Sequence, residues 1–194
     1  MSEYSARQIE IMDIAVDLIS AKGIQKLTIK NLSAAVGVTE GAIYRHFTSK
    51  KQILLGLLER FQRSQIENFK AISALDLDPV ERLHMIYTKR FQMFSDRPAL
   101  AAVIFSEEIF QNDSELAEYV SKIMSDNQKA IKRIIKNGQK TELIRNDISD
   151  DQLAMVIMGL LRLIVTRWRV SGFKFNLIKE GEKLWETTVK ILQN

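Results

Sequence analysis

Apolar residues recur along the chain at intervals of three and four, the spacing that places them on one face of an α-helix. No segment alternates between apolar and polar residues for long enough to predict a β-strand. The pattern therefore predicts an all-α fold of about nine helices, near residues 7–22, 28–37, 39–47, 50–72, 79–95, 98–110, 114–138, 150–171 and 176–193.

Polar residues stand at the predicted helix starts, where their side-chain oxygens can accept hydrogen bonds from unpaired backbone amides. Thr28 and Thr39 each precede a short helix, and Ser49 with Gln52 has the spacing of a capping box. The run Asp78-Pro-Val-Glu81 combines a cap, a proline at the first helical position and a second capping-box carboxylate. These signals fix the starts of the helices more firmly than periodicity alone.

The chain changes character near residue 50, which predicts two modules. Three predicted helices lie within residues 1–50, and further helices fill residues 51–194. The helix at about 50–72 links the two, and the segment 73–78 is the first plausible linker. We expect an N-terminal helix-turn-helix module over residues 1–50 followed by a separate helical bundle over residues 51–194.

The stretch from Thr28 to Lys51 carries the chemistry of the first module. Two short helices joined by a glycine turn, with a third helix starting directly after, form the arrangement that inserts a helix into the DNA major groove. Ile43 and Phe47 can face the core. Gly41 costs about 1 kcal/mol in a helix interior relative to alanine. A residue so small makes sense where the backbone must approach another molecule.

These residues also carry a resemblance. The pattern T-I-K-N-L…V-G-V-T-E-G-A-I-Y-R-H-F-x-S-K-K-x-I-L resembles the DNA-binding domain of the TetR family of bacterial transcriptional regulators, over roughly residues 7–60. The resemblance implies phosphate contacts from Tyr44, His46 and Lys50, and base contacts from residues near the start of the third helix. The full set of implied DNA-binding residues is Thr28, Thr39, Glu40, Gly41, Ala42, Tyr44, Arg45, His46, Lys50 and Lys51.

Several of these residues also suit a purely structural role. Tyr44 is an ordinary packed aromatic residue in many helices, His46 suits a surface or cap position, and Lys50 with Lys51 suits a solvated helix start. Glu40 is unfavourable beside phosphates unless its carboxylate accepts from a cytosine amino group.

Bulky, soft apolar residues distinguish the second module, and they suit either an adaptable cavity or a plain core. In the family that the N-terminal segment resembles, this domain commonly encloses an effector. The candidate lining residues are Phe91, Phe94, Phe105, Met124, Met158 and Arg162. Arg162 suits the counter-charge of an anionic ligand and equally an ion pair between subunits.

The last two helices are apolar over more than one face, which would leave apolar surface exposed in a monomer. Pairing with a twofold mate into a four-helix bundle would remove that surface. The candidate dimer-interface residues are Leu160, Leu161, Ile164, Trp168, Leu184 and Trp185. A homodimer would also place two recognition helices about one DNA turn apart.

Composition excludes several other classes of protein. The chain contains no cysteine, which excludes disulfides and thiolate metal sites and fits a reducing bacterial cytoplasm near the nucleoid. Its start has no signal-peptide run, and the apolar stretch 153–170 contains three arginines, which argues against a membrane span. No metal-spaced histidine cluster, phosphate loop or nucleophile motif is present, and adjacent carboxylates such as Glu107 and Glu108 suit solvated surface. We therefore expect no enzyme activity, no cofactor and no metal.

The net charge of +4 and the pI of about 9.2 permit a polyanionic partner. We expect a homodimeric DNA-binding regulator, most simply a repressor that a small apolar or amphipathic effector releases from double-stranded DNA. A diffuse similarity of the run GLLRLIVTRWRVSGFKFN supports an alternative, a subgroup of the same family that coats chromosomal DNA and blocks the cell-division protein FtsZ. An all-helical enzyme is the third and weakest alternative.

Overall fold

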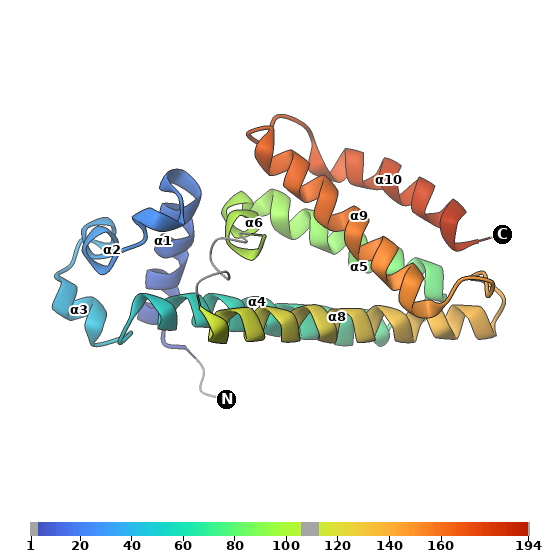
Figure 1. The fold of residues 1–194 in the computed structure, drawn as a ribbon, viewed down its shortest axis with the longest axis horizontal. Coiled ribbons are helices and arrows are strands. Elements are labelled where there is room, and N and C mark those ends of the chain that lie inside the picture. The colour runs from blue at the N-terminus through green and yellow to red at the C-terminus, as the bar shows by residue number, and fades with distance from the viewer. Residues whose placement is uncertain (1–3, 106–112, 194) are drawn as a thin grey trace. The chain divides into compact units, whose positions relative to one another are not determined.

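The structure is a computed structural model that describes residues 4–105 and 113–193 (Figure 1). Within these residues it contains nine α-helices, one 3₁₀ turn and no strand, which confirms the predicted all-α fold. The helices are α1 (Ala6–Lys22), α2 (Ile29–Val36), α3 (Glu40–Tyr44), α4 (Lys50–Ser73), α5 (Pro79–Asp96), α6 (Pro98–Ile104), α8 (Ser114–Lys140), α9 (Asp150–Val170) and α10 (Leu177–Leu192), and the 3₁₀ turn is η1 (Ile24–Lys26). The predicted extension of α6 from residue 106 to Phe110 lies outside the described residues.

The predicted caps account for most helix starts. Thr28 Oγ1 accepts from the Asn31 amide at 3.1 Å, and Thr39 Oγ1 accepts from the Ala42 amide at 3.2 Å. Asp78 forms the full reciprocal capping box with Glu81, with a proline at the first helical position. The Ser49 hydroxyl accepts from the Gln52 amide as expected, but the Gln52 side chain accepts from the Thr48 backbone and not from Ser49. The capping box predicted there is therefore only half formed.

The helices form two compact units. Unit 1 comprises Met1–Arg63 and Pro98–Val120, and unit 2 comprises Ser64–Arg97 and Ser121–Asn194. Helices α4 and α8 contribute residues to both units. Unit 1 therefore contains the predicted helix-turn-helix segment together with the start of α4, with α6 and with the start of α8. The domain boundary near residue 50 stays a prediction.

Unit 1 has a continuous apolar core that holds its short helices in place. Helix α1 packs against α2 and α6, and α2 packs against α3. The fully buried side chains include those of Met12, Leu32, Ile43 and Phe47. At Gly56 of α4, an added Cβ would lie 2.8 Å from Met12 Sδ, so α1 approaches α4 too closely for a larger residue. The three-helix head is thus packed firmly enough to present a surface helix in a fixed orientation.

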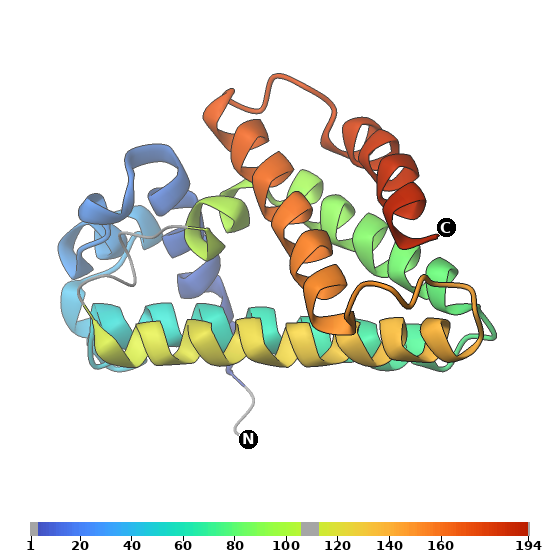
Figure 2. The same cartoon turned by 45° about the vertical axis from the view of Figure 1, so that its right-hand side comes forward.

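Unit 2 is built around α5, with α9 and α10 packed beside it (Figure 2). An added Cβ at Gly181 of α10 would lie 2.4 Å from the Phe91 ring, so glycine permits the close approach of α10 to α5. Trp185 of α10 stacks on His84 at a centroid distance of 5.1 Å, and its ring also meets Tyr87. The aromatic side chains of α5 and α10 therefore form the core of this unit.

Candidate nucleic-acid interface

The segment that joins α2 to α3 is a tight turn with a defined backbone. Gly37 closes α2 in the left-handed region with φ of 76°, a conformation that suits glycine, and the Val38 amide donates to the Ser33 carbonyl at 2.9 Å. Thr39 caps α3 two residues later. Sequence and local physics thus set the angle at which α3 leaves α2.

The two faces of α3 separate as the pattern predicts. Ile43 and Phe47 are buried, with exposed fractions of 0% and 1%. Gln8 of α1 donates to the His46 carbonyl at 3.2 Å and ties the end of this segment to α1. On the outer side, the residues with exposed side chains or backbone are Thr28, Thr39, Glu40, Gly41, Tyr44 and Arg45, whereas Ala42 and His46 are half-buried. Unit 1 therefore brings these predicted DNA-binding residues to an accessible stretch around α3.

None of the described residues gives a packing reason for glycine at position 41. It lies inside α3, it is not among the residues with positive φ, and an added Cβ would meet only Thr39 Oγ1, at 4.0 Å. Alanine there would favour the helix by about 1 kcal/mol. The small residue is explained if another molecule approaches the α3 backbone from outside.

Positive charge is concentrated around the same segment. Residues 20–51 hold six of the chain's 28 Lys and Arg but only one of its 24 Asp and Glu. The rest of the chain holds 22 Lys and Arg and 23 Asp and Glu. The one carboxylate in this range is Glu40, and the exposed lysines include Lys22, Lys26 and Lys30, which motif reasoning did not single out. A count of charge along the sequence would have found them. The N-terminal segment that contains α3 therefore carries a clear excess of positive charge.

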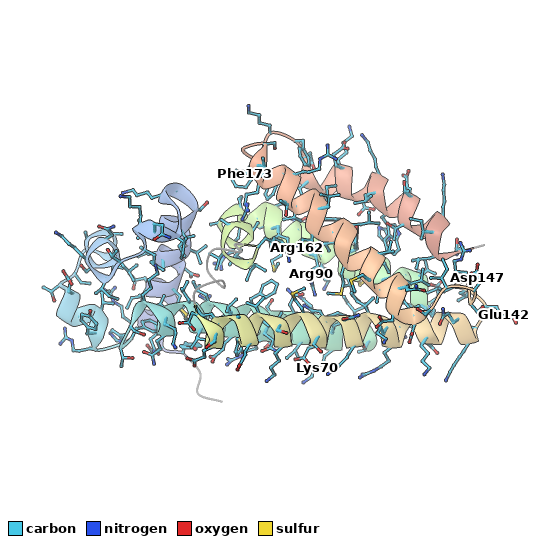
Figure 3. The ribbon with its side chains drawn as sticks, in the orientation of Figure 1. Lys70, Arg90, Glu142, Asp147, Arg162 and Phe173 are labelled. Atoms are coloured by element: carbon cyan, nitrogen blue, oxygen red, sulfur yellow. The ribbon has the colours of Figure 1, made fainter. Side chains whose placement is uncertain are left out.

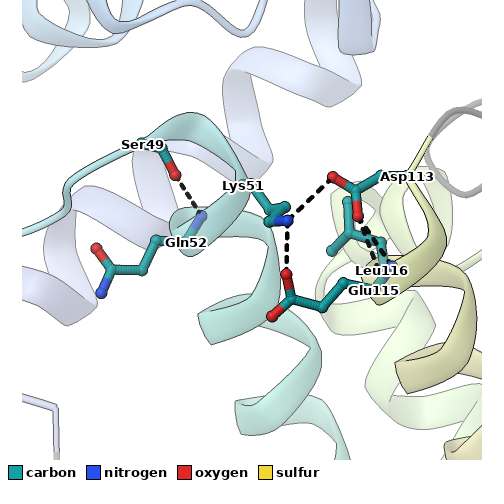
Figure 4. A network of polar contacts seen from close by, with 6 residues as sticks. All are labelled: Ser49, Lys51, Gln52, Asp113, Glu115 and Leu116. Carbon is teal, nitrogen blue, oxygen red and sulfur yellow. Dashed lines mark hydrogen bonds and ion pairs between the residues drawn. The ribbon is translucent and has the colours of Figure 1, made fainter.

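The two lysines at the start of α4 differ in their surroundings. Lys50 Nζ donates to the Ile24 carbonyl at 3.1 Å, which anchors the ammonium group. Lys51 Nζ pairs with Glu115 and lies 3.5 Å from Asp113, both on the α8 side of unit 1 (Figure 4). The hydrogen bond to Glu115 raises the pKa of the Lys51 ammonium. Lys51 is therefore partly neutralised by two carboxylates of unit 1.

This contrast predicts different salt dependences for two neighbouring variants. Lys50→Ala should weaken binding to all duplex sequences and lower the slope of log K against log salt by about one, because one phosphate contact is lost. Lys51→Ala should lower the slope less, since Lys51 already has carboxylate partners. Binding titrations at several salt concentrations measure both slopes. Equal slopes for the wild type and Lys50→Ala would show that Lys50 makes no phosphate contact.

The predicted effector residues differ in burial. Phe91 and Phe94 of α5 are fully buried. Met124 was expected to point inward, and this is wrong, because its side chain is 46% exposed on α8. Met158 and Arg162 are half-buried on α9 in unit 2, and Phe105 is half-buried in unit 1. Phe91 and Phe94 are therefore core residues of α5.

Arg90 of α5 is a more informative cation that was not proposed as a ligand residue (Figure 3). Burial lowers the pKa of its guanidinium to about 10, and its Nη2 donates to the neutral Asn127 amide oxygen at 3.1 Å. Beside it lies a void of about 10 Å³, lined in part by Gln65, Asn68 and Lys89, which has room for about one water. A largely buried cation held by an amide marks the interior of unit 2 as a place that can accept an anion.

Four of the predicted dimer-interface residues are core of the single chain, which corrects the expectation that a monomer would expose them. The side chains of Leu161, Ile164, Trp168 and Trp185 are between 4% and 9% exposed, because α9 and α10 pack on each other and on α5. Leu160 and Leu184 are half-buried. The surface that α9 leaves open comprises Met155 (60% exposed), Val156 (39%), Leu163 (58%) and Val170 (78%), with Gly159 between them.

Gly159, like Gly41, is a helical glycine with open space around it. It lies in the middle of α9, is exposed, and an added Cβ would have no atom within 4 Å. Its cost of about 1 kcal/mol in a helix is not offset within this chain. A glycine surrounded by exposed Met155, Val156 and Leu163 is the arrangement that lets a second helix approach closely.

The described residues contain neither a candidate metal site nor a candidate membrane span. No group of three or more histidine, aspartate or glutamate residues there could hold a metal ion. None of the helices in residues 4–105 and 113–193 is long and apolar enough to cross a lipid bilayer.

Two family descriptions match consecutive parts of the chain. Residues 11–57 match "Bacterial regulatory proteins, tetR family", and residues 58–191 match "YsiA-like protein, C-terminal region". The second match alone covers more than half of the sequence.

Individual relatives are distant but cover nearly the whole chain. The nucleoid occlusion factor SlmA of Vibrio vulnificus is 23% identical over 185 residues, 95% of this chain and 94% of that protein. The fatty acid metabolism regulator protein of Bacillus subtilis is 22% identical over 194 residues, the full length of both chains. Among solved structures, FadR from Bacillus subtilis in complex with stearoyl-CoA matches with a TM-score of 0.83 at 22% identity, over 95% of this chain and 99% of that one.

Proposed function

The chain belongs to the TetR family of bacterial DNA-binding regulators, and from that premise we propose that it is a ligand-responsive repressor acting as a homodimer. Its operator would be pseudo-palindromic, because a twofold dimer presents two identical recognition helices to the duplex. The observation that carries the proposal is the exposed α3 stretch, where a helical glycine that meets no packed side chain among the described residues lies in a cationic region of the sequence.

Roles for individual residues follow from their positions. Tyr44 and Lys50 would contact phosphates, and the residues from Thr39 to Ala42 with Arg45 would face base edges in the major groove. His46 is half-buried with its carbonyl bonded to Gln8, so its main role would be to hold the end of α3. Lys51 would contribute little, because Asp113 and Glu115 compete with phosphate for its ammonium group.

The open face of α9 supports the homodimer. Met155, Leu163 and Val170 of α9 are apolar side chains that are more than half exposed, whereas the exposed face of α10 is polar. Burying apolar area gains about 25 cal/mol per Å², so a twofold contact along α9 would be favourable. The interface we propose therefore moves from the predicted α9–α10 residues to Met155, Val156, Gly159, Leu163 and Val170.

For the effector we propose a long-chain acyl thioester of coenzyme A or a similar amphipathic anion. The Bacillus subtilis FadR structure with stearoyl-CoA supports this class of ligand, and the largely buried guanidinium of Arg90 supports its negative charge. The void beside Arg90 holds about one water, so a ligand must displace side chains to enter unit 2. Such a ligand would favour an expanded conformation and shift the protein away from its DNA-bound form.

The test is release of DNA by ligand. Operator fragments are first selected from the source genome, and stearoyl-CoA is then titrated into the complex, with free coenzyme A as the control. We expect release by the acyl thioester and not by coenzyme A. Arg90→Met should raise the concentration needed at least tenfold, whereas the exposed control Lys122→Met should not. Failure of any acyl thioester to release operator DNA would contradict the effector class.

A second function has one specific support, the similarity to the nucleoid occlusion factor SlmA. In that case the protein would bind DNA without an acyl effector and would act on FtsZ. Addition of the DNA-bound protein to FtsZ filaments distinguishes the two, because a ligand-responsive repressor should leave the filaments unchanged.

A further inference from the structure

An open groove of about 360 Å³ lies in unit 2, where the end of α4 and the first turn of α5 meet the last turns of α8. The polar side chains that line it are those of Ser73, Arg82, Arg133, Lys136, Asn137 and Lys140. Each of them can donate a hydrogen bond, and no carboxylate is among the lining residues. The polar lining of the groove therefore offers hydrogen-bond donors and positive charge, and no negative charge.

Three of the four cations that line this groove come from residues 127–140 of α8, which hold five Lys and Arg and no Asp or Glu. Outside residues 20–51 the sequence is nearly balanced, with 22 Lys and Arg against 23 Asp and Glu, yet four cations surround this one groove. None of the four pairs with a carboxylate within residues 4–105 and 113–193. Like charges at the walls of a concave surface repel one another and attract an anion into the space between them.

Arg82 gives a second and independent sign of a missing partner. Its Nη2 donates to the Leu75 carbonyl at 3.2 Å, but its Nε is buried without a hydrogen-bond partner in the described structure. A buried donor without a partner is unfavourable, and an oxyanion that accepts from the guanidinium edge would satisfy it. Arg82 also lies in the first turns of α5, at the positive end of the helix dipole, so the dipole does not explain this cation.

We propose that this groove binds a small anion carrying at least two phosphate groups, as in a pyrophosphate ester. Arg82 would hold one phosphate through its guanidinium edge, and Arg133, Lys136 and Lys140 would hold the next, with Ser73 and Asn137 as neutral donors. The volume suits a small molecule and is too small for a DNA duplex. This site lies in unit 2, away from the α3 segment in sequence. The coenzyme A part of the proposed effector also contains a pyrophosphate, but the groove can be tested with inorganic pyrophosphate alone, without an acyl chain or operator DNA.

The test uses inorganic pyrophosphate as the probe, titrated calorimetrically into the full chain at low salt. We expect saturable binding of one pyrophosphate per chain. The double variant Arg133→Gln/Lys136→Gln should weaken it about tenfold or more, because two charge-assisted contacts are lost. Arg82→Lys keeps the charge but removes the guanidinium edge, and it should also weaken binding. The matched control Lys122→Gln/Lys129→Gln removes two exposed α8 cations outside the groove and should change affinity less than twofold.

Each other outcome overturns the assignment. Absence of saturable binding in the millimolar range would leave the groove without the proposed ligand. If pyrophosphate affinity fell equally in the control variant, the loss would come from the change in net charge and not from the groove. Sulfate that binds as tightly as pyrophosphate at the same ionic strength would make it an unselective anion site. Loss of non-operator DNA binding in Arg133→Gln/Lys136→Gln, with pyrophosphate displaced by that DNA, would make the groove a nucleic-acid surface.

Discussion

Leu163→Arg is expected to convert the protein into a folded monomer and to lower its operator affinity by about 100-fold or more. In the proposed dimer, the substitution would bury two guanidinium groups without partners beside the twofold axis, which is strongly unfavourable. A monomer binds one half-site and loses the high effective concentration of its second head, a loss of about 10²–10⁴ in affinity. Light scattering measures the mass, and gel-shift titration on whole and half operators measures the binding.

The fold itself should survive this change, because Leu163 is 58% exposed in the single chain. The matched control is Thr187→Arg, which introduces the same charge on the exposed polar face of α10. That variant should remain a dimer with the affinity of the wild type. A Leu163→Arg protein that stays dimeric would exclude the α9 face from the interface and leave its apolar surface for another partner.

The correction at α9 shows what a sequence pattern can and cannot determine about an interface. Periodicity identified a helix that is apolar on more than one face, and the structure agrees, since Leu161, Ile164 and Trp168 face inward while Met155 and Leu163 face outward. Both sets have helical spacing. Which of them faces the core depends on how α9 packs against α5 and α10, and long-range packing is not contained in local spacing. The large residues were assigned to the interface, but they form the core.

Local chemistry was predicted better than long-range pairing. The Thr28, Thr39 and Asp78 caps and the burial of Ile43 with Phe47 follow from interactions within one turn, and all were predicted correctly. The pairing of Lys51 with Asp113 and Glu115 joins residues more than 60 positions apart, so no helix pattern could reveal it.

Arg90 and Arg82 show a related difficulty at candidate binding sites. The helix spacing places Arg90 on the same side as Leu83 and Phe91, but it does not show which nitrogen atoms of either arginine are buried or lack a partner, and only the packing shows this. Glycine is more informative in sequence, because its cost in a helix is known in advance. For Gly41 the structure adds that none of the described residues gives a packing reason for it.

Enlarging Gly41 should separate DNA binding from stability more clearly than any other single change. Gly41→Ala and Gly41→Leu should leave the melting temperature unchanged or raise it, because the side chain enters open space and α3 gains about 1 kcal/mol of helix propensity. Operator affinity should fall in the same order, by at least about tenfold for leucine, since the added atoms would hold the α3 backbone away from the base edges. Thermal unfolding and operator titration measure the two effects, and Ser20→Leu on the exposed side of α1 controls for added apolar surface.

A Gly41→Leu protein with full operator affinity would show that α3 does not lie in the groove. A protein that binds less because it unfolds would show that the glycine serves the fold, and the argument from open space around Gly41 would then be wrong.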